Sequence, residues 1–244
     1  MLQGYMWVLA VSLIAGAVSG VIGTGSSVML LPVLVHVFGP KEAVPVMAMA
    51  AVVGNAGRVV AWWREVDWRA VGAYALPGAP AAALGARAQW AMPAHAVDLA
   101  LGLFFVLLVP ARHLLRQREW RLGLSQLAVA GAVTGFLTGL VLSTGPLSVP
   151  VFTAYGLVKG AFLATEAASA LLLYLTKVAT FSGLGALPLD LAIKGLIVGS
   201  ALTVGTFVGK VFVLRLPAQM FQRLLDGLML LSGLALLAAA RNAP

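Results

Sequence analysis

The feature that most limits how this chain folds is a series of apolar runs that continues along its whole length. A helix needs about 20 apolar residues to cross a bilayer, and most of the runs are close to that length. Of the 244 residues, 61% are hydrophobic and 10% are charged, whereas about a quarter of the residues in a soluble domain are charged. The sequence therefore predicts an all-α integral membrane protein with a single membrane domain. The runs lie at about 5–19, 28–38, 43–63, 70–90, 96–111, 122–142, 146–157, 161–183, 188–211 and 218–240.

Two of these runs, 28–38 and 146–157, are near half the length of a crossing helix, and each follows a break rich in glycine and hydroxyl residues. The first break lies within Ser19–Pro32 and the second within Thr134–Pro150. Non-helical backbone inside a membrane survives only where protein or a cavity surrounds it. We therefore expect each break to form the tip of a re-entrant hairpin near the middle of the membrane.

The two halves of the chain match beyond the breaks, which indicates an internal duplication. Aligning Pro32 with Pro150 places Lys41 opposite Lys159. Each half would hold one hairpin and three full crossings, and an odd number of crossings inverts the second copy relative to the first, as in many transporters. The predicted repeats are 1–119, with hairpin 5–38 and helices 43–63, 70–90 and 96–111, and 120–244, with hairpin 122–157 and helices 161–183, 188–211 and 218–240.

The basic residues predict how the chain is oriented. The formal net charge is +8, but Lys and Arg lie mainly in short connections, so the charge reflects the positive-inside rule rather than nucleic-acid binding. The hairpin arrangement predicts that both termini lie outside and that the connection 112–121 is cytoplasmic. A single crossing at each break would leave the basic residues almost evenly divided, whereas two full crossings would give the same orientation as a hairpin. In the hairpin arrangement, one face receives Arg64, Arg69, Arg112, Arg116, Arg118, Arg121, Lys159, Lys210, Arg215 and Arg223, and the other receives Lys41, Arg87, Lys194 and Arg241.

The breaks are candidate anion sites. A helix that begins inside the membrane presents unpaired N–H groups and the positive end of its dipole, and both attract an anion. Serine and threonine cap such helix starts, and glycine allows a ligand to approach the backbone closely. Discontinuous helices in matching positions also point to the binding site of a transporter. The candidate residues in the breaks are Gly23, Thr24, Gly25, Ser26, Ser27, Ser143, Thr144 and Gly145.

Two basic residues, Arg58 and Lys177, lie inside apolar runs at nearly matching positions of the two halves. Charge there is costly and favours a role in binding an anion, with Asn55 and Tyr174 as weaker candidates one short turn earlier. The alternative is that the long side chains snorkel to the interface. Glu166 is a candidate for carrying a coupling proton, or is a solvated carboxylate near the interface.

Metal and thiol chemistry find no support in the sequence. The three histidines, His36, His95 and His113, are scattered at segment ends without a second ligand at helical spacing. The chain has no cysteine, which excludes disulfides and thiolate sites. We expect no metal and no cofactor.

The glycine motif resembles that of a known family. The run Ser19-Gly20-Val21-Ile22-Gly23-Thr24-Gly25-Ser26-Ser27, followed by Pro32, is similar to the repeated motif of the TauE/SafE sulfite-exporter family, as is Phe38-Gly39-Pro40-Lys41-Glu42-Ala43. The resemblance implies two homologous halves and export of sulfite, sulfonates or related organosulfur anions across the bacterial inner membrane. The family's usual three glycines are here Gly25-Ser26-Ser27 and Thr144-Gly145-Pro146, so the anion can differ from sulfite.

Together these features predict a secondary transporter that moves a small sulfur-containing oxyanion by alternating access, driven by a proton or ion gradient. The expected partners are the anion, a coupling ion and the lipid bilayer, without nucleic acid, and the oligomeric state stays open. One alternative is a passive, channel-like pathway for the same anions. Another is an intramembrane hydrolase with Ser26 or Ser27 as nucleophile, which would need a base that none of the histidines supplies in the middle of a run.

Overall fold

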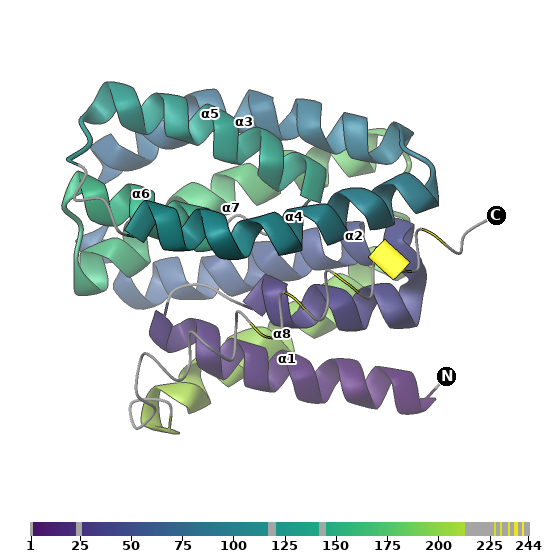
Figure 1. The fold of residues 1–244 in the computed structure, drawn as a ribbon. Coiled ribbons are helices and arrows are strands. Elements are labelled where there is room, and N and C mark those ends of the chain that lie inside the picture. The colour runs from purple at the N-terminus through teal and green to yellow at the C-terminus, as the bar shows by residue number, and fades with distance from the viewer. Residues whose placement is uncertain are drawn as a thin grey trace.

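The computed structural model describes residues 2–22, 26–116, 121–141 and 145–212, together with the single residues 227, 230, 234, 237, 238 and 241. Within these residues every regular element is helical, as the sequence predicts (Figure 1). The predicted helix 218–240 lies outside the described residues except for isolated positions. The elements are α1 (Leu2–Ile22), α2 (Ser26–Trp62), the 3-10 turn η1 (Trp63–Glu65), α3 (Trp68–Ala91), α4 (Ala94–Arg116), α5 (Leu124–Val141), α6 (Gly145–Tyr155), α7 (Lys159–Gly183) and α8 (Leu189–Phe212).

The helices form three layers. Figure 1 shows α3 with α5 on one side, α1 with α8 on the other, and α2 with α7 between them. The main contacts follow the order α5, α3, α7, α2, α8, α1, so the centre of the molecule is the pair α2 and α7. Helices α4 and α6 cover one face of this central pair (Figure 1).

Glycines bring the paired helices into backbone contact. A side chain at Gly78 would strike the backbone of Gly131, and one at Gly85 would strike Gly139. Because both contacts advance together along the sequence, α3 and α5 run in the same direction. Gly195 and Gly199 pack on α2 in the same way, as their small-residue spacing predicts.

The central helices α2 and α7 run in opposite directions. Arg58, near the end of α2, contacts Glu166 in the first half of α7, and Glu65, just after α2, lies against Gly160 at the start of α7. Helix α3 runs parallel to α7, since Ala75 packs with Ala168 and Gly78 lies against Leu173 farther along. Helices α3, α5 and α7 therefore begin at the same end of the molecule.

Two glycines reverse the chain after its short helical sections. Gly39 has φ 78° and interrupts α2, so the helical section from Ser26 to Phe38 stands apart from the rest of α2. Gly156 has φ 106° and follows α6, which is 11 residues long. Both φ values lie in the region that glycine adopts without strain, so the sequence provides for a sharp turn at each place.

Each short section ends near the point where the preceding helix begins. The Tyr5 and Phe38 rings lie 5.6 Å apart, which joins the start of α1 to the end of the first section of α2. The Leu122 N–H donates to the Ala154 carbonyl at 3.0 Å, which joins the start of α5 to the end of α6. Each pair therefore begins and ends at the same end of the molecule, α1 with the first section of α2 at one end and α5 with α6 at the other.

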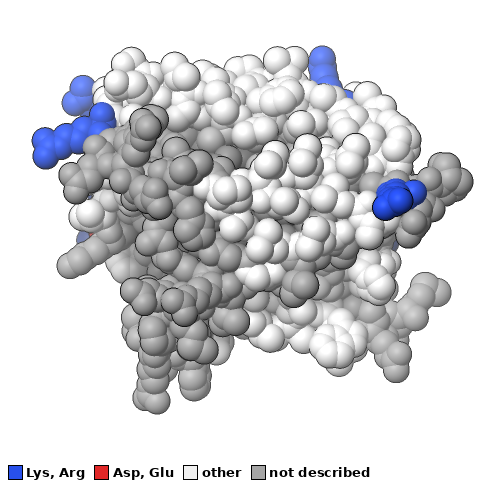
Figure 2. Space-filling view, in the orientation of Figure 1, with Lys and Arg blue, Asp and Glu red and all other residues white. Residues whose placement is uncertain are grey.

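The apolar surface agrees with a membrane location. Within the described residues, four helical segments are long and apolar enough to cross a membrane: Lys41–Val60, Leu124–Val141, Gly160–Gly183 and Leu189–Val208. On the face in Figure 2, the Lys and Arg side chains lie toward the ends and an uncharged band lies between them. Shorter apolar stretches occur at Tyr5–Ser19, Met29–Phe38 and His95–Phe104.

Candidate functional site

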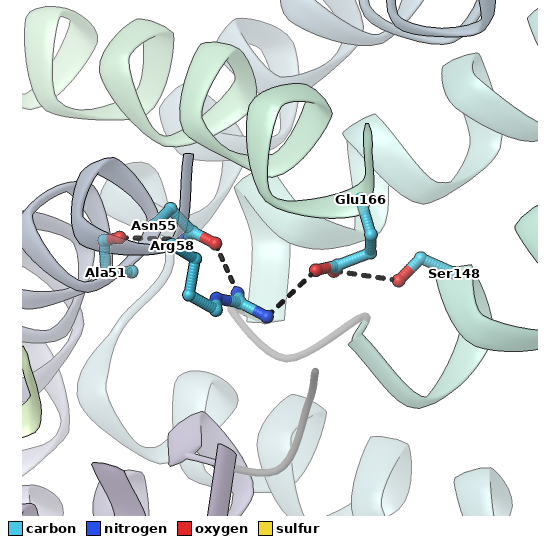
Figure 3. Close-up of polar contacts among 5 residues, drawn as sticks. All are labelled: Ala51, Asn55, Arg58, Ser148 and Glu166. Carbon is cyan, nitrogen blue, oxygen red and sulfur yellow. Dashed lines mark hydrogen bonds and ion pairs between the residues drawn. The ribbon is translucent and has the colours of Figure 1, made fainter. Parts of the chain in front are cut away.

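A buried ion pair joins the two central helices. Arg58 Nη1 of α2 lies 3.1 Å from Glu166 Oε2 of α7, and the two side chains are 11% and 5% exposed (Figure 3). The Arg58 side chain contacts this carboxylate and does not snorkel to a polar interface. Glu166 is likewise buried, so the alternative of a solvated carboxylate is wrong. An ion pair at this depth is retained only where its charges hold one another or serve a function.

Asn55 fixes the arginine from its own helix. The Asn55 Nδ2 group donates to the Ala51 carbonyl at 2.7 Å, and Asn55 Oδ1 accepts a hydrogen bond from Arg58 Nη2 (Figure 3). Both bonds follow from helical spacing, since the residues lie four and three positions apart. The structure thus brings two predicted site residues together with Glu166.

The first turn of the short helix α6 supplies a further contact to the same carboxylate. Ser148 Oγ donates to Glu166 Oε1 at 3.1 Å (Figure 3). Ser148 lies three residues after Gly145, a predicted site residue and the first residue of α6. The start of α6 and the ion pair are therefore parts of one polar cluster, which we call the Arg58 cluster: Asn55, Arg58, Ser148 and Glu166.

Lys177 lies in a different environment. Its side chain is fully buried, and Nζ donates to the Thr138 carbonyl at 2.8 Å and to the Gly139 carbonyl. These carbonyls belong to the last turn of α5, and carbonyls in the last turn of a helix have no N–H donor within that helix. The ammonium caps the end of α5 and does not snorkel to the interface.

The two buried basic residues therefore have different partners. Arg58 contacts Glu166, and Lys177 follows Glu166 by eleven residues on α7, a distance of about 16 Å along a helix. From the sequence alone, Arg58 and Lys177 are equal candidates for binding the substrate. In the structure, Arg58 is linked through Glu166 to the first turn of α6, and Lys177 donates to the last turn of α5.

Tyr174 connects the start of α2 to the central pair. Its hydroxyl forms a hydrogen bond with the Ser27 side chain, and its electrostatic neighbours include Glu166 and Arg58. Helix α2 begins at Ser26. Two predicted candidates from distant parts of the chain thus meet at the start of the first short helical section.

The remaining predicted residues of the breaks are Gly23, Thr24, Gly25, Ser143 and Thr144, which lie outside the described residues. Within the described residues, no group of His, Asp and Glu side chains could hold a metal ion.

The structure also adds polar residues that sequence reasoning missed. Ser148 lies within the second break, Thr134–Pro150, where nothing in the sequence distinguishes it from its neighbours. Ser169 is fully buried on α7, one turn after Glu166, and its hydroxyl has no hydrogen-bond partner among the described residues. The Tyr74 hydroxyl and Thr134 Oγ1 form a buried hydrogen bond between α3 and α5. Single polar residues in apolar helices give no pattern by which a sequence could separate them from packing residues.

Comparison with known proteins gives a family match. The family model described as sulfite exporter TauE/SafE matches residues 8–236, nearly the whole chain. No curated protein and no solved structure matches the chain.

Proposed function

Because this chain belongs to the sulfite exporter TauE/SafE family of membrane transporters, we propose that it moves a small sulfur-containing oxyanion across the bacterial inner membrane. Sulfite, thiosulfate and sulfonates are the candidate substrates. The family match favours this activity over hydrolysis at Ser26 or Ser27.

The observation that carries the proposal is the Arg58 cluster. A buried guanidinium lies between the central helices and is linked through Glu166 to the first turn of α6. The start of a helix and an arginine both favour an anion, and both gain strength where water is excluded. The predicted break residues would complete the site, with Ser27 and Tyr174 contributing from the start of α2.

Alternating access by two inverted repeats is the mechanism we favour. The packing order supports it, because the order is symmetric about the central pair of α2 and α7. On one side α7 is followed by α3 and α5, and on the other side α2 is followed by α8 and α1. In two repeats, α1 would correspond to α5, α8 to α3 and α2 to α7. Opposite directions of α2 and α7 and the two closing contacts, Tyr5 with Phe38 and Leu122 with Ala154, support inverted re-entrant hairpins. Relative rocking of the repeats would expose the central pair to each side in turn.

The positive-inside rule supports an orientation with the start of α3 facing the cytoplasm. Arg64 and Arg69 flank that start. At the other end, Lys41 lies 5.5 Å from the Trp90 ring and Lys194 lies 5.2 Å from the Phe38 ring. The start of α1 lies near Phe38 and would therefore face outward.

Transport in proteoliposomes tests the proposal. We expect saturable uptake of radiolabelled thiosulfate, driven by a proton gradient and inhibited by sulfite. The Arg58→Gln variant should lose this uptake, while Arg64→Gln, which removes an exposed arginine, should retain it. Folded wild-type protein that neither binds nor moves any sulfur oxyanion would contradict the proposal, and unsaturable flux would favour a channel-like pathway.

A further inference from the structure

We infer that the Glu166 carboxylate occupies the place of the transported oxyanion, so that substrate and Glu166 compete for Arg58 and Ser148. This inference rests on the proposed function and specifies how its site works. The site would bind an oxyanion that offers two oxygen atoms to two donors on different helices.

The geometry within the Arg58 cluster is that of a bound oxyanion. One carboxylate oxygen lies 3.1 Å from the guanidinium of α2, and the other accepts from Ser148 of α6 at 3.1 Å. The carboxylate itself comes from a third helix, α7 (Figure 3). A side chain on α7 can leave while both donors stay in place, because they belong to α2 and α6.

The chemistry of the donors suits sulfur oxyanions as well as carboxylates. A guanidinium binds paired oxygens through two parallel N–H groups, and a hydroxyl donates to any oxygen acceptor. Sulfite and sulfonates carry three oxygens where a carboxylate carries two. Ser169, one turn along α7 from Glu166, has a buried hydroxyl without a hydrogen-bond partner among the described residues and is suited to the third oxygen.

Displacement of Glu166 would also couple the binding of the anion to the uptake of a proton. A carboxylate that loses its arginine inside the membrane is costly while charged, so it takes a proton as the anion binds. One anion and one proton then enter together, and a monovalent anion leaves the charge of the site unchanged.

The groups that surround Glu166 provide no second cation among the described residues. Arg58 contacts it from α2, and the nearby Tyr74 of α3 and Tyr174 of α7 carry no positive charge. At the start of α7, the Asp67 N–H donates to Thr165 Oγ1 and Glu65 lies against Gly160, while Arg64 and Arg69 beside them are exposed. Displaced Glu166 would therefore find a proton more readily than a new basic partner.

Calorimetric titration of purified protein with thiosulfate and with methanesulfonate tests the inference. Both probes stay fully ionised between about pH 6 and pH 8, so any pH dependence belongs to the protein. If one proton binds with each anion, wild-type affinity should rise by up to about tenfold for each pH unit of acidification. Glu166→Gln should bind at least about tenfold more tightly at pH 8 and lose the pH dependence, because its amide competes weakly for Arg58. Glu42→Gln, the same change at an exposed position, should behave as wild type.

Proton uptake by the wild-type protein gives an independent measurement that does not depend on how a variant folds. Titrations at pH 8 in two buffers with different ionisation heats should reveal about one proton taken up for each anion bound. Wild-type binding without proton uptake, or Glu166→Gln binding that is weaker or keeps its pH dependence, would overturn the inference and leave the proposed function standing. Absence of any anion binding by folded wild-type protein would overturn both.

Discussion

Arg58 and Lys177 occupy nearly matching positions in the two halves of the chain, yet their partners differ in kind. Arg58 contacts side chains, namely Asn55 and Glu166, and through Glu166 it is linked to Ser148. Lys177 contacts the backbone carbonyls of Thr138 and Gly139. A side-chain partner can turn away or take a proton, whereas a carbonyl at the end of a helix stays in place.

The different partners indicate different roles for Arg58 and Lys177, which their nearly matching positions in the sequence would not suggest. An arginine held by an exchangeable carboxylate is suited to bind a substrate, because its partner can be replaced without moving the backbone. Lys177 of α7 is fully buried and donates to the last turn of α5. It is suited to stabilise the end of that helix, where the dipole is negative. The partners of the two basic residues therefore favour binding for Arg58 and stabilisation for Lys177.

The largest effect that separates the two cations is on stability at Lys177. We expect Lys177→Met to lower the free energy of unfolding by about 2–4 kcal/mol, because it leaves two buried carbonyls without their charged donor. Lys194→Met is the matched control, since Lys194 forms a partly exposed i,i+4 pair with Asp190 and its loss should change stability by less than about 0.5 kcal/mol. Unfolding in mixed micelles measures both. Equal losses would show that Lys177 does not cap α5.

Much of the fold can be predicted from the sequence, because its signals are local. Apolar runs and charge predict helices that cross a membrane, and α8 spans Leu189–Phe212 where the sequence predicts 188–211. The short helix α6 follows from a glycine break and the length of the run after it. Each of these features depends on residues within about 20 positions of one another.

The contacts of the site are harder to predict, because they depend on how distant helices cross. The sequence identifies Arg58 and Glu166 as unusual charges, but nothing local pairs residues 108 positions apart. The partners of Lys177 are backbone carbonyls, which every residue carries, so no residue type could reveal them. Ser148 resembles many other serines in apolar helices until the crossing of α6 and α7 places it beside Glu166.

A smaller effect concerns the exchangeable partner itself. We expect Arg58→Gln to destabilise the protein, because it leaves Glu166 buried without a cation, and we expect Glu166→Gln to restore most of that loss. The coupling energy of the double-mutant cycle should be about 1–3 kcal/mol. Restored stability should not restore thiosulfate binding, since the double variant still lacks the guanidinium. Stability losses that simply add would indicate that the two side chains do not depend on one another.

No single side-chain change should rescue Lys177→Met in this way, because its partners are backbone groups. A rescue of Arg58→Gln together with none for Lys177→Met would therefore sharpen the distinction between an exchangeable and a fixed partner.

The smallest effect tests whether α6 takes part in binding. In the Glu166→Gln background, where no carboxylate competes for the same hydroxyl, Ser148→Ala should weaken thiosulfate binding by about five- to tenfold, equivalent to about 1–1.4 kcal/mol, because one neutral donor is lost while Arg58 remains. Ser12→Ala is the matched control, since Ser12 is also fully buried but donates to Val8 of its own helix at 2.6 Å. If both variants weaken binding equally, the loss reflects general packing of the helices. A loss confined to Ser148→Ala would place the start of α6 with Arg58 in the binding site.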